Sequence, residues 1–189
     1  MKHVMLIAGA RPNFVKIGPI SRALRARRTF RVTLVHTGQH YDRSLSGDFF
    51  SSLDIPEPDY NLGVGSGSHA WQTAEMMKGL EDVFAKERPD FVLVYGDTNS
   101  TLGGARAAAE AGVRLAHVEA GLRTYDMSQP FPEEMNRVLI SRLASIHFAP
   151  TPQARDHLLA EGTPPASVQD AAPIRAPGTF AESPLPLVP

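Results

Sequence analysis

The sequence of 189 residues contains no cysteine, which excludes disulfides, thiolate zinc sites and cysteine nucleophiles. It also lacks an excess of charge of either sign, because 19 Lys and Arg stand against 20 Asp and Glu. A protein that holds nucleic acid by its phosphates is usually strongly basic, so nucleic acid is not the expected partner. The apolar opening, residues 1–8, is too short for a membrane span or a signal peptide. We therefore expect a cytoplasmic protein, without membrane contact, that binds a small and specific ligand.

Short apolar runs alternate with helical patterns along most of the chain. The runs are typical of strands buried on both faces of a parallel sheet, and they cover residues 4–8, 31–35, 91–94, 114–118 and 145–148. Helical spacing is found from Pro12 onward, over 44–53, over about 70–87, over 98–111 and from Thr151 onward. This alternation predicts an α/β fold with a doubly wound parallel sheet.

Two details of the helices can be predicted further. Ser66 or Ser68 is placed to cap the helix over 70–87, and Thr151 followed by Pro152 is a typical helix start. On the helix over 70–87, the side chains expected to face the core are Trp71, Ala74, Met77, Leu80 and Phe84.

The end of the chain differs from the rest. Nine of the 16 prolines lie from Pro150 onward, and residues 171–189 show no usable hydrophobic period. We therefore expect one folded lobe over residues 1–166 and an extended or disordered proline-rich tail over residues 167–189.

Polar residues follow the predicted strands, at the carboxyl edge where a doubly wound sheet binds ligands. Arg11 and Lys16 follow the first strand beside a helix N-terminus, which favours a phosphate or another anion. The alternative is that both are simply exposed cations on a first helical turn. Gln39 and His40 follow the second strand and could contact a ligand.

Three carboxylates come from separate loops. Asp97 follows the third long strand, where a helix N-cap is the alternative role, and Glu119 follows the fourth, where pairing with Arg123 is the alternative. Glu133 begins a later helix. Carboxylates that meet in one pocket and have different pKa values can act as the acid and the base of general acid–base catalysis.

The alternative for Glu133 is structural. Together with Glu134 it lies in a first helical turn, within reach of Arg137 three or four residues later. His117 and His147 alternate into apolar strands, so we expect both to be core residues rather than metal ligands. No histidine and carboxylate pattern supports a metal site.

Several motifs, taken in order and spacing, resemble the N-terminal half of the non-hydrolysing UDP-N-acetylglucosamine 2-epimerases. They are the segments 9–12 (GARP), 36–42 (HTGQHYD), 63–70, 95–101 (YGDTNST), 117–123 (HVEAGLR) and 132–137 (PEEMNR). The resemblance implies a Rossmann-like lobe of a two-lobed enzyme, similar to B-type glycosyltransferases, with a UDP-sugar in the cleft between the lobes.

The resemblance also implies a reaction. UDP-GlcNAc and UDP-ManNAc are interconverted by removal of the C2 proton and loss of UDP, followed by return of UDP and of a proton to the opposite face, without a nicotinamide or metal cofactor. Asp97, Glu119 and Glu133 match the acidic residues of these steps, and Arg11 and Lys16 match basic residues near the substrate. The remaining residues that we expect to bind substrate are Gln39, His40, Arg123 and Arg137.

The chain departs from this family after Ala166, where a second lobe normally follows and is absent here. We therefore expect little or no epimerase activity from this polypeptide alone. Two alternatives stay open: a lobe that works with a separate C-terminal partner, and an epimerase of a diacetamido UDP-sugar. The resemblance also implies a homodimer built through this lobe.

Overall fold

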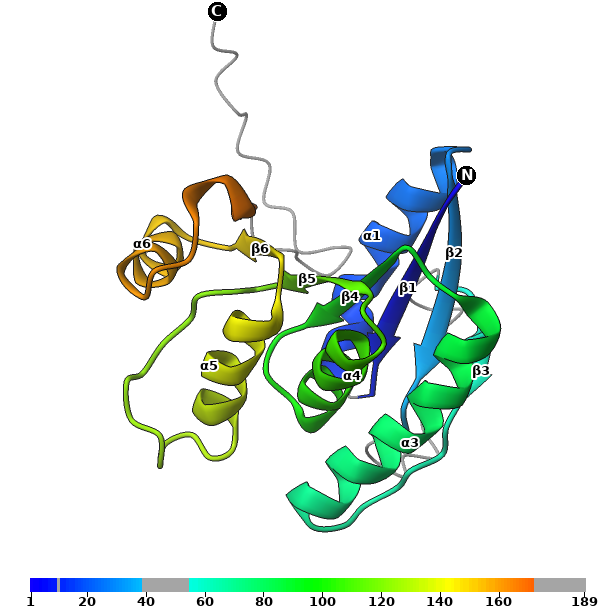
Figure 1. The fold of residues 1–189 in the computed structure, drawn as a ribbon, viewed down its shortest axis with the longest axis horizontal. Coiled ribbons are helices and arrows are strands. Elements are labelled where there is room, and N and C mark those ends of the chain that lie inside the picture. The colour runs from blue at the N-terminus through cyan, green and yellow to red at the C-terminus, as the bar shows by residue number, and fades with distance from the viewer. Residues whose placement is uncertain (10, 39–54, 172–189) are drawn as a thin grey trace, which may run out of the picture.

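The computed structural model describes residues 1–9, 11–38 and 55–171. Within these ranges the chain forms one sheet of seven parallel strands in the order β3-β2-β1-β4-β5-β6-β7 (Figure 1). The strands are β1 (Lys2–Ala8), β2 (Phe30–His36), β3 (Tyr60–Asn61), β4 (Phe91–Tyr95), β5 (Arg114–Val118), β6 (Ile146–Ala149) and β7 (Val168–Asp170). The predicted doubly wound parallel sheet is confirmed.

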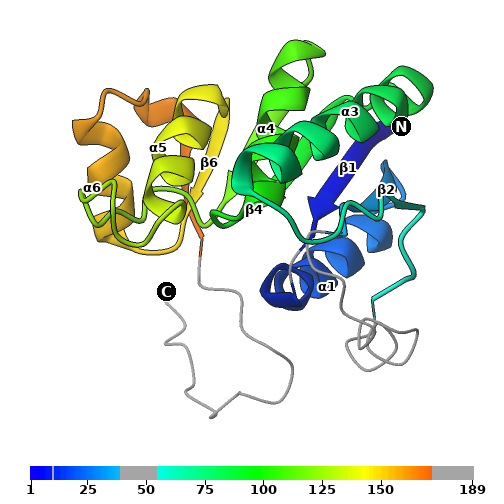
Figure 2. The same cartoon turned by 90° about the horizontal axis from the view of Figure 1, so that it is seen from below.

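Helices cover both faces of the sheet. Figure 2 shows α1 on one side and α3, α4, α5 and α6 on the other. Their bounds are α1 (Arg11–Ala26), α3 (His69–Glu87), α4 (Asn99–Glu110), α5 (Glu133–Leu143) and α6 (Pro152–Ala160), and a short 3-10 helix spans Pro165–Ser167. None of the helices in the described ranges is long and apolar enough to cross a membrane.

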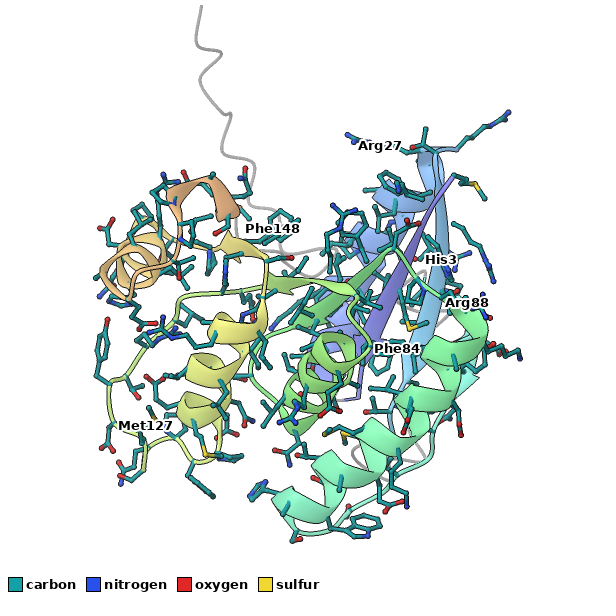
Figure 3. All side chains as sticks on the ribbon, viewed as in Figure 1. His3, Arg27, Phe84, Arg88, Met127 and Phe148 are labelled. Atoms are coloured by element: carbon teal, nitrogen blue, oxygen red, sulfur yellow. The ribbon has the colours of Figure 1, made fainter. Side chains whose placement is uncertain are left out.

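The strand β1 shows why both faces are buried. Its side chains alternate between two hydrophobic clusters, as the two-residue period of a strand requires. Leu6 packs in the cluster that contains Phe14 of α1. Ile7 packs in the opposite cluster, which contains Leu80 and Phe84 of α3 (Figure 3). The continuous apolar run of β1 is thus explained by burial from both sides.

The strand order reverses between β1 and β4. From β1 the chain proceeds outward to β2 and β3, and β4 then pairs on the other side of β1, with Leu6 opposite Leu93. In open α/β sheets, ligands bind outside the carboxyl ends of the strands at such a switch point. The segments that begin at Gly9 and Gly96 therefore border the expected ligand site.

Side-chain caps start three helices, two of them at residues that the sequence predicts. The backbone N–H of Trp71 donates to Ser68 Oγ at 3.3 Å, and that of Ala154 donates to Thr151 Oγ1 at 3.1 Å, with Pro152 in the first turn of α6. Thr98, rather than Asp97, caps α4. Asp97 therefore does not have the capping role that the sequence left open.

The inward face of α3 differs from the prediction. Trp71 and Ala74 are exposed, and the buried residues are Gln72, Met76, Leu80, Val83 and Phe84. The prediction was wrong for Trp71 and Ala74, and it is confirmed for Leu80, Phe84 and the partly buried Met77. Met76 lies beside α4, where a Cβ on Gly103 would be 3.2 Å from Met76 Cβ, and the ring of Trp71 lies against Gly67.

Two short strands could not be predicted from the sequence. The strand β3 has two residues and β7 has three, which is too short for a hydrophobic pattern. The strand β7 pairs with β6, with Val168 opposite His147, and Ala171 N–H donates to Ala149 O at 2.9 Å. The sheet thus continues past residue 166, where we expected the tail to begin. The helix predicted over 44–53 and residues 172–189 lie outside the described residues.

Candidate active site

Two carboxylates follow neighbouring strands at the carboxyl edge of the sheet. Tyr95 of β4 is opposite Val118 of β5, and Asp97 and Glu119 come just after these two residues. Each carboxylate side chain is 25% exposed, and each has its own cation. They are therefore sheltered from bulk water, yet open enough to reach a ligand.

The first cation is Lys16 of α1, whose Nζ forms an ion pair with Glu119 Oε2. Glu119 itself has a left-handed backbone with φ of +65°, which is costly for a residue other than glycine. Such conformations persist where the surrounding structure holds them, and they are frequent at functional sites. The alternative pairing of Glu119 with Arg123 is not what the structure shows.

Gly96 lies at the centre of this arrangement. Its φ is +67°, and a Cβ placed on it would be 3.6 Å from Glu119 Oε2 and 3.7 Å from Lys16 Nζ. The backbone that carries Asp97 therefore passes directly beside the Lys16–Glu119 pair. Asn13 of α1 also approaches from this side, donating from Nδ2 to Tyr95 O at 2.6 Å.

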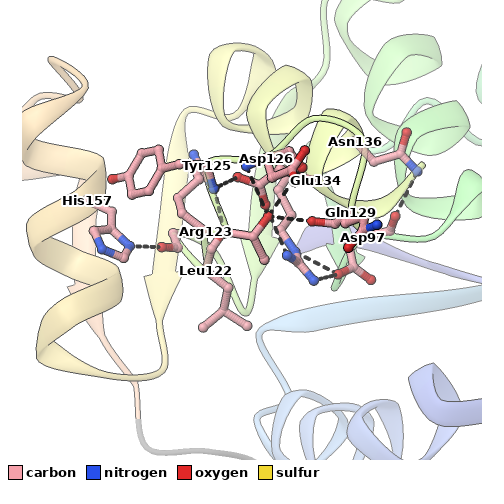
Figure 4. Close-up of polar contacts among 12 residues, drawn as sticks. Asp97, Leu122, Arg123, Tyr125, Asp126, Gln129, Glu134, Asn136 and His157 are labelled. Atoms are coloured by element: carbon pink, nitrogen blue, oxygen red, sulfur yellow. Dashed lines mark hydrogen bonds and ion pairs between the residues drawn. The ribbon is translucent and has the colours of Figure 1, made fainter. Parts of the chain in front are cut away.

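The second cation is Arg137 of α5, which lies between two carboxylates (Figure 4). It donates from Nε to Asp97 Oδ2 at 2.8 Å, with Nη2 in an ion pair with the same oxygen at 2.6 Å, and it donates from Nη1 to Glu134 Oε2 at 3.0 Å. Asn136 Nδ2 adds a bond to the backbone carbonyl of Asp97 at 2.7 Å. The first turns of α5 thus fix both the side chain and the backbone of Asp97.

Glu134 is the anchor of this network, and its side chain is almost completely buried. Its Oε1 accepts the backbone N–H of Tyr125 at 3.0 Å, which ties the loop after β5 to α5. Burial raises the pKa of Glu134, but the backbone amides of Thr124 and Tyr125 together with Arg137 outweigh it, so this pKa lies below its usual value. Glu134 thus has a structural role. The sequence does not distinguish the role of Glu134 from that of Glu133, although the three-residue spacing to Arg137 indicates a contact.

Arg123 is held elsewhere. Its side chain is fully buried, and it donates to both carboxylate oxygens of Glu161, at 2.7 and 2.8 Å, and to Ser141 Oγ at 2.8 Å. His157 Nδ1 meets Gly121 O at 3.0 Å on the same side. These contacts fasten the loop after β5 to α5 and α6, so the structure does not bring Arg123 into the cluster around Asp97 and Glu119.

The remaining expected site residues are placed as follows. Arg11 is the first residue of α1, and Glu133 is half-buried as the first residue of α5. Gln39 and His40 lie outside the described residues. The expected core positions of His117 and His147 are confirmed, because the side chains are buried.

The cavity of about 960 Å³ found in the described part lies at the opposite edge of the sheet. It opens between α3 and α4, and it is bordered by Asp90 and Arg114, at the amino ends of β4 and β5. A ligand site in a parallel sheet belongs at the carboxyl edge, so we do not assign the chemistry to this cavity. In the ranges that the structure describes, no three His, Asp or Glu side chains gather as a metal site would require.

The arrangement at the carboxyl edge suits proton transfer beside an anionic group. Asp97 and Glu119 can each take or give a proton, and Lys16 and Arg137 supply positive charge next to them. The N-terminus of α1 borders the same edge, and its helix dipole favours a phosphate there.

Comparisons with known proteins agree on one family. The sequence profile of UDP-N-acetylglucosamine 2-epimerase matches residues 22–171. A UDP-N-acetylglucosamine 2-epimerase homolog of Methanococcus maripaludis is 50% identical over 159 residues, which are 84% of this chain and 43% of the relative. The UDP-2,3-diacetamido-2,3-dideoxy-D-glucuronate 2-epimerase of Pseudomonas aeruginosa is 48% identical over 159 residues, which are 84% of this chain and 44% of the relative.

Solved structures give the same result. The UDP-GlcNAc 2-epimerase of Methanocaldococcus jannaschii, in complex with UDP-GlcNAc and UDP, is 43% identical with a TM-score of 0.84. The match covers 90% of this chain and 46% of that one. The chain thus spans less than half the length of the relatives that it matches.

Proposed function

The chain belongs to the UDP-N-acetylglucosamine 2-epimerase family, and from that premise we propose that it carries the acid–base half of a UDP-sugar 2-epimerase site. The observation that supports this most directly is the pair Asp97 and Glu119 on neighbouring strand ends, each beside its own cation. Inversion at a carbon needs one group to remove a proton and another to deliver one to the opposite face, and two separately held carboxylates meet this need.

The proposed reaction is an elimination followed by an addition. The C2–H bond and the bond from C1 to the UDP oxygen break, a C1–C2 double bond forms, and a carboxylate holds the proton. The reverse step returns the UDP oxygen to C1 and delivers a proton to the other face of C2. We assign these proton transfers to Asp97, Glu119 and Glu133, and no cofactor is needed because nothing is oxidised.

The cations then have distinct tasks. Lys16 and Arg11 lie at the α1 end of the edge and would stabilise the negative charge of the departing UDP. Arg137 would orient Asp97, with which it forms an ion pair. A contact between Arg137 and the sugar nucleotide would therefore lie next to the Asp97 carboxylate. Gln39, His40 and Arg123 remain proposed substrate contacts, and for Arg123 such a contact requires that it leave Glu161.

UDP-GlcNAc, converted to UDP-ManNAc, is the substrate that we propose first. A diacetamido UDP-sugar is the second candidate, because the diacetamido-glucuronate epimerase is as similar to this chain, at 48% identity, as relatives described as UDP-GlcNAc 2-epimerases, at 46%. We further propose a cytoplasmic location for either reaction.

The match covers less than half of each relative. The relatives have more than twice the length of the matched part, so we propose that a separate C-terminal lobe completes the cleft. We also propose a homodimer, because Trp71 and Phe131 are 45% and 59% exposed, and the ring of Phe131 contacts His69 near Trp71. Exposed apolar side chains of this size are typical of protein interfaces.

The test is calorimetric titration of the chain with UDP-GlcNAc and with UDP, together with an assay for UDP-ManNAc. Binding without turnover is the expected result for these residues, because they match less than half of the length of the relatives. Turnover by the chain alone would overturn the need for a second lobe. Failure of the folded chain to bind either ligand, alone and mixed with a C-terminal half, would overturn the proposed function.

A further inference from the structure

We propose that His117 is a positioning residue, whose ring holds the Gly96 backbone and thereby the catalytic candidate Asp97 in place. The inference rests on the proposed function only in that Asp97 is the group being placed. Its physical basis is the contact between a buried imidazole of β5 and the carbonyl of the glycine that follows β4.

The first observation is the hydrogen bond itself. His117 Nε2 lies 2.7 Å from Gly96 O. A carbonyl oxygen only accepts, so Nε2 must carry the proton. His117 Nδ1 is buried without a hydrogen-bond partner in the described part of the chain, which agrees with this tautomer because an unpaired acceptor is better tolerated than an unpaired N–H.

The second observation is that β5 forms hydrogen bonds with both the N–H and the carbonyl of Gly96. The Gly96 N–H donates to Val118 O at 3.0 Å, while its carbonyl accepts from His117. Between these two bonds the backbone turns through φ of +67° and leaves the sheet towards Asp97. Two bonds from one strand thus fix the direction in which Asp97 departs.

The third observation is where the turn lies. A Cβ on Gly96 would lie 3.6 Å from Glu119 Oε2 and 3.7 Å from Lys16 Nζ, so Gly96 faces the ion pair across the space that one methyl group would fill. A displacement of Gly96 would therefore move Asp97 relative to Glu119. The hydrogen bond from His117 to the Gly96 carbonyl opposes such a displacement.

The chain contains its own control. His147 of β6 is in register with His117 and is likewise buried, at 2% exposure, with Nδ1 unpartnered within the described ranges. Its ring is bonded to the backbone of Ala144 instead of Gly96. If both histidines only filled the core, replacing either one should have the same effect on the Gly96 turn. If His117 positions the turn, only its replacement should disturb Gly96.

The experiment compares His117→Gln and His117→Leu with His147→Gln and His147→Leu in the whole chain. The amide nitrogen of glutamine can replace Nε2 as a donor to Gly96 O, and leucine cannot. The readouts are the unfolding midpoint, the backbone amide resonances of Gly96 and Asp97, and the Arg137 Nε–H resonance, which reports the bond to Asp97. The imidazole nitrogen spectrum of the unsubstituted chain reports the tautomer directly.

We expect His117→Leu to shift the Gly96, Asp97 and Arg137 resonances. In His117→Gln we expect these resonances to stay near their positions in the unsubstituted chain. We expect both His147 variants to leave these resonances unchanged, whatever their effect on the unfolding midpoint. Equal displacement by the two leucine variants, or a His117 ring protonated on Nδ1 instead of Nε2, would overturn the proposal. If His117→Leu does not fold, His117→Gln and the tautomer decide the question. Since no ligand is added, the result is independent of whether the chain binds a UDP-sugar.

Discussion

Two nitrogens of the Arg137 guanidinium meet a single oxygen of Asp97, Nε in a hydrogen bond of 2.8 Å and Nη2 in an ion pair of 2.6 Å, although 40 residues separate the two in the chain. Its third nitrogen donates to the buried Glu134. Arg137 thus neutralises a structural carboxylate and orients a proposed catalytic one. The site is therefore part of the framework that holds α5 against the sheet edge.

Replacement of Arg137 tests this double role. Arg137→Ala leaves Glu134 buried without its cation, so we expect the free energy of unfolding to fall by about 3 kcal/mol. Arg106→Ala is the control, because it removes an exposed Arg–Glu pair with Glu110 and should cost below about 0.5 kcal/mol. Urea unfolding measures both, and similar losses for the two variants would contradict the role assigned to Glu134.

Gly121 should tolerate no side chain. Its φ is +85°, and a Cβ there would lie 2.1 Å from the carbonyl oxygen of Ala154, a backbone atom of α6. We expect Gly121→Ala to cost more than about 3 kcal/mol, through the left-handed backbone and the displacement of α6. Gly112→Ala is the matched control, with φ of +67° and open space around it, and should cost about 1 kcal/mol. Thermal unfolding of the two variants decides, and equal costs would refute the close packing.

Stability should fall as the pH decreases from 7 to 5. Burial lowers the pKa of His117 to about 4, helped by the positive charges of His147, Arg123 and Lys16 and opposed by the bond to Gly96. The unfolded chain, with an ordinary histidine pKa of about 6.5, binds the proton more readily, so the loss is about 2 kcal/mol between pH 7 and pH 5. Burial also lowers the pKa of His147 and of His36, and both act in the same direction.

His117→Gln removes the largest of these contributions. Urea midpoints measured at pH 5 and pH 7 should therefore differ less in this variant than in the unsubstituted chain. An unchanged pH dependence would show that His117 is not held neutral in the folded state.

Lys16 is expected to matter for ligand binding. Lys16→Met removes a largely buried positive charge from the edge where we place the UDP group. We expect UDP-sugar affinity to fall at least about tenfold, because a hydrogen bond to a charged group is worth about 1.5–3 kcal/mol. Lys78→Met removes an exposed lysine that pairs with Glu75 on α3, and should leave the affinity unchanged. Calorimetric titration measures both, and equal affinities would remove Lys16 from the site.

The sheet could be predicted from the sequence because its five longer strands are short and largely apolar, which is typical of buried parallel strands. The strands β3 and β7 could not, because strands of two and three residues carry no pattern. The inward position of Met76 could not be predicted from α3 alone, because it lies against Gly103 of another helix.

The candidate site shows the same division between local and distant information. Asp97 and Glu119 could be predicted as edge residues because each follows an apolar run. Their partners lie 40 and 103 residues away, and the local alternatives, a helix cap and a pair with Arg123, were the ones not formed. Long-range ion pairs depend on the fold, and a single sequence does not encode them in its spacing.

The most direct test of the proposed function joins residues 1–171 of this chain to the C-terminal part of the Methanocaldococcus jannaschii UDP-GlcNAc 2-epimerase, which is 43% identical to it over the shared half. The chimera is incubated with UDP-GlcNAc in D₂O, and proton NMR follows the C2 hydrogen. Deuterium at C2 together with UDP-ManNAc, and loss of both in Asp97→Asn and Glu119→Gln, is the result that we predict. A folded chimera that binds UDP-GlcNAc but leaves its C2 hydrogen unexchanged would contradict the assignment of the acid–base half to this chain.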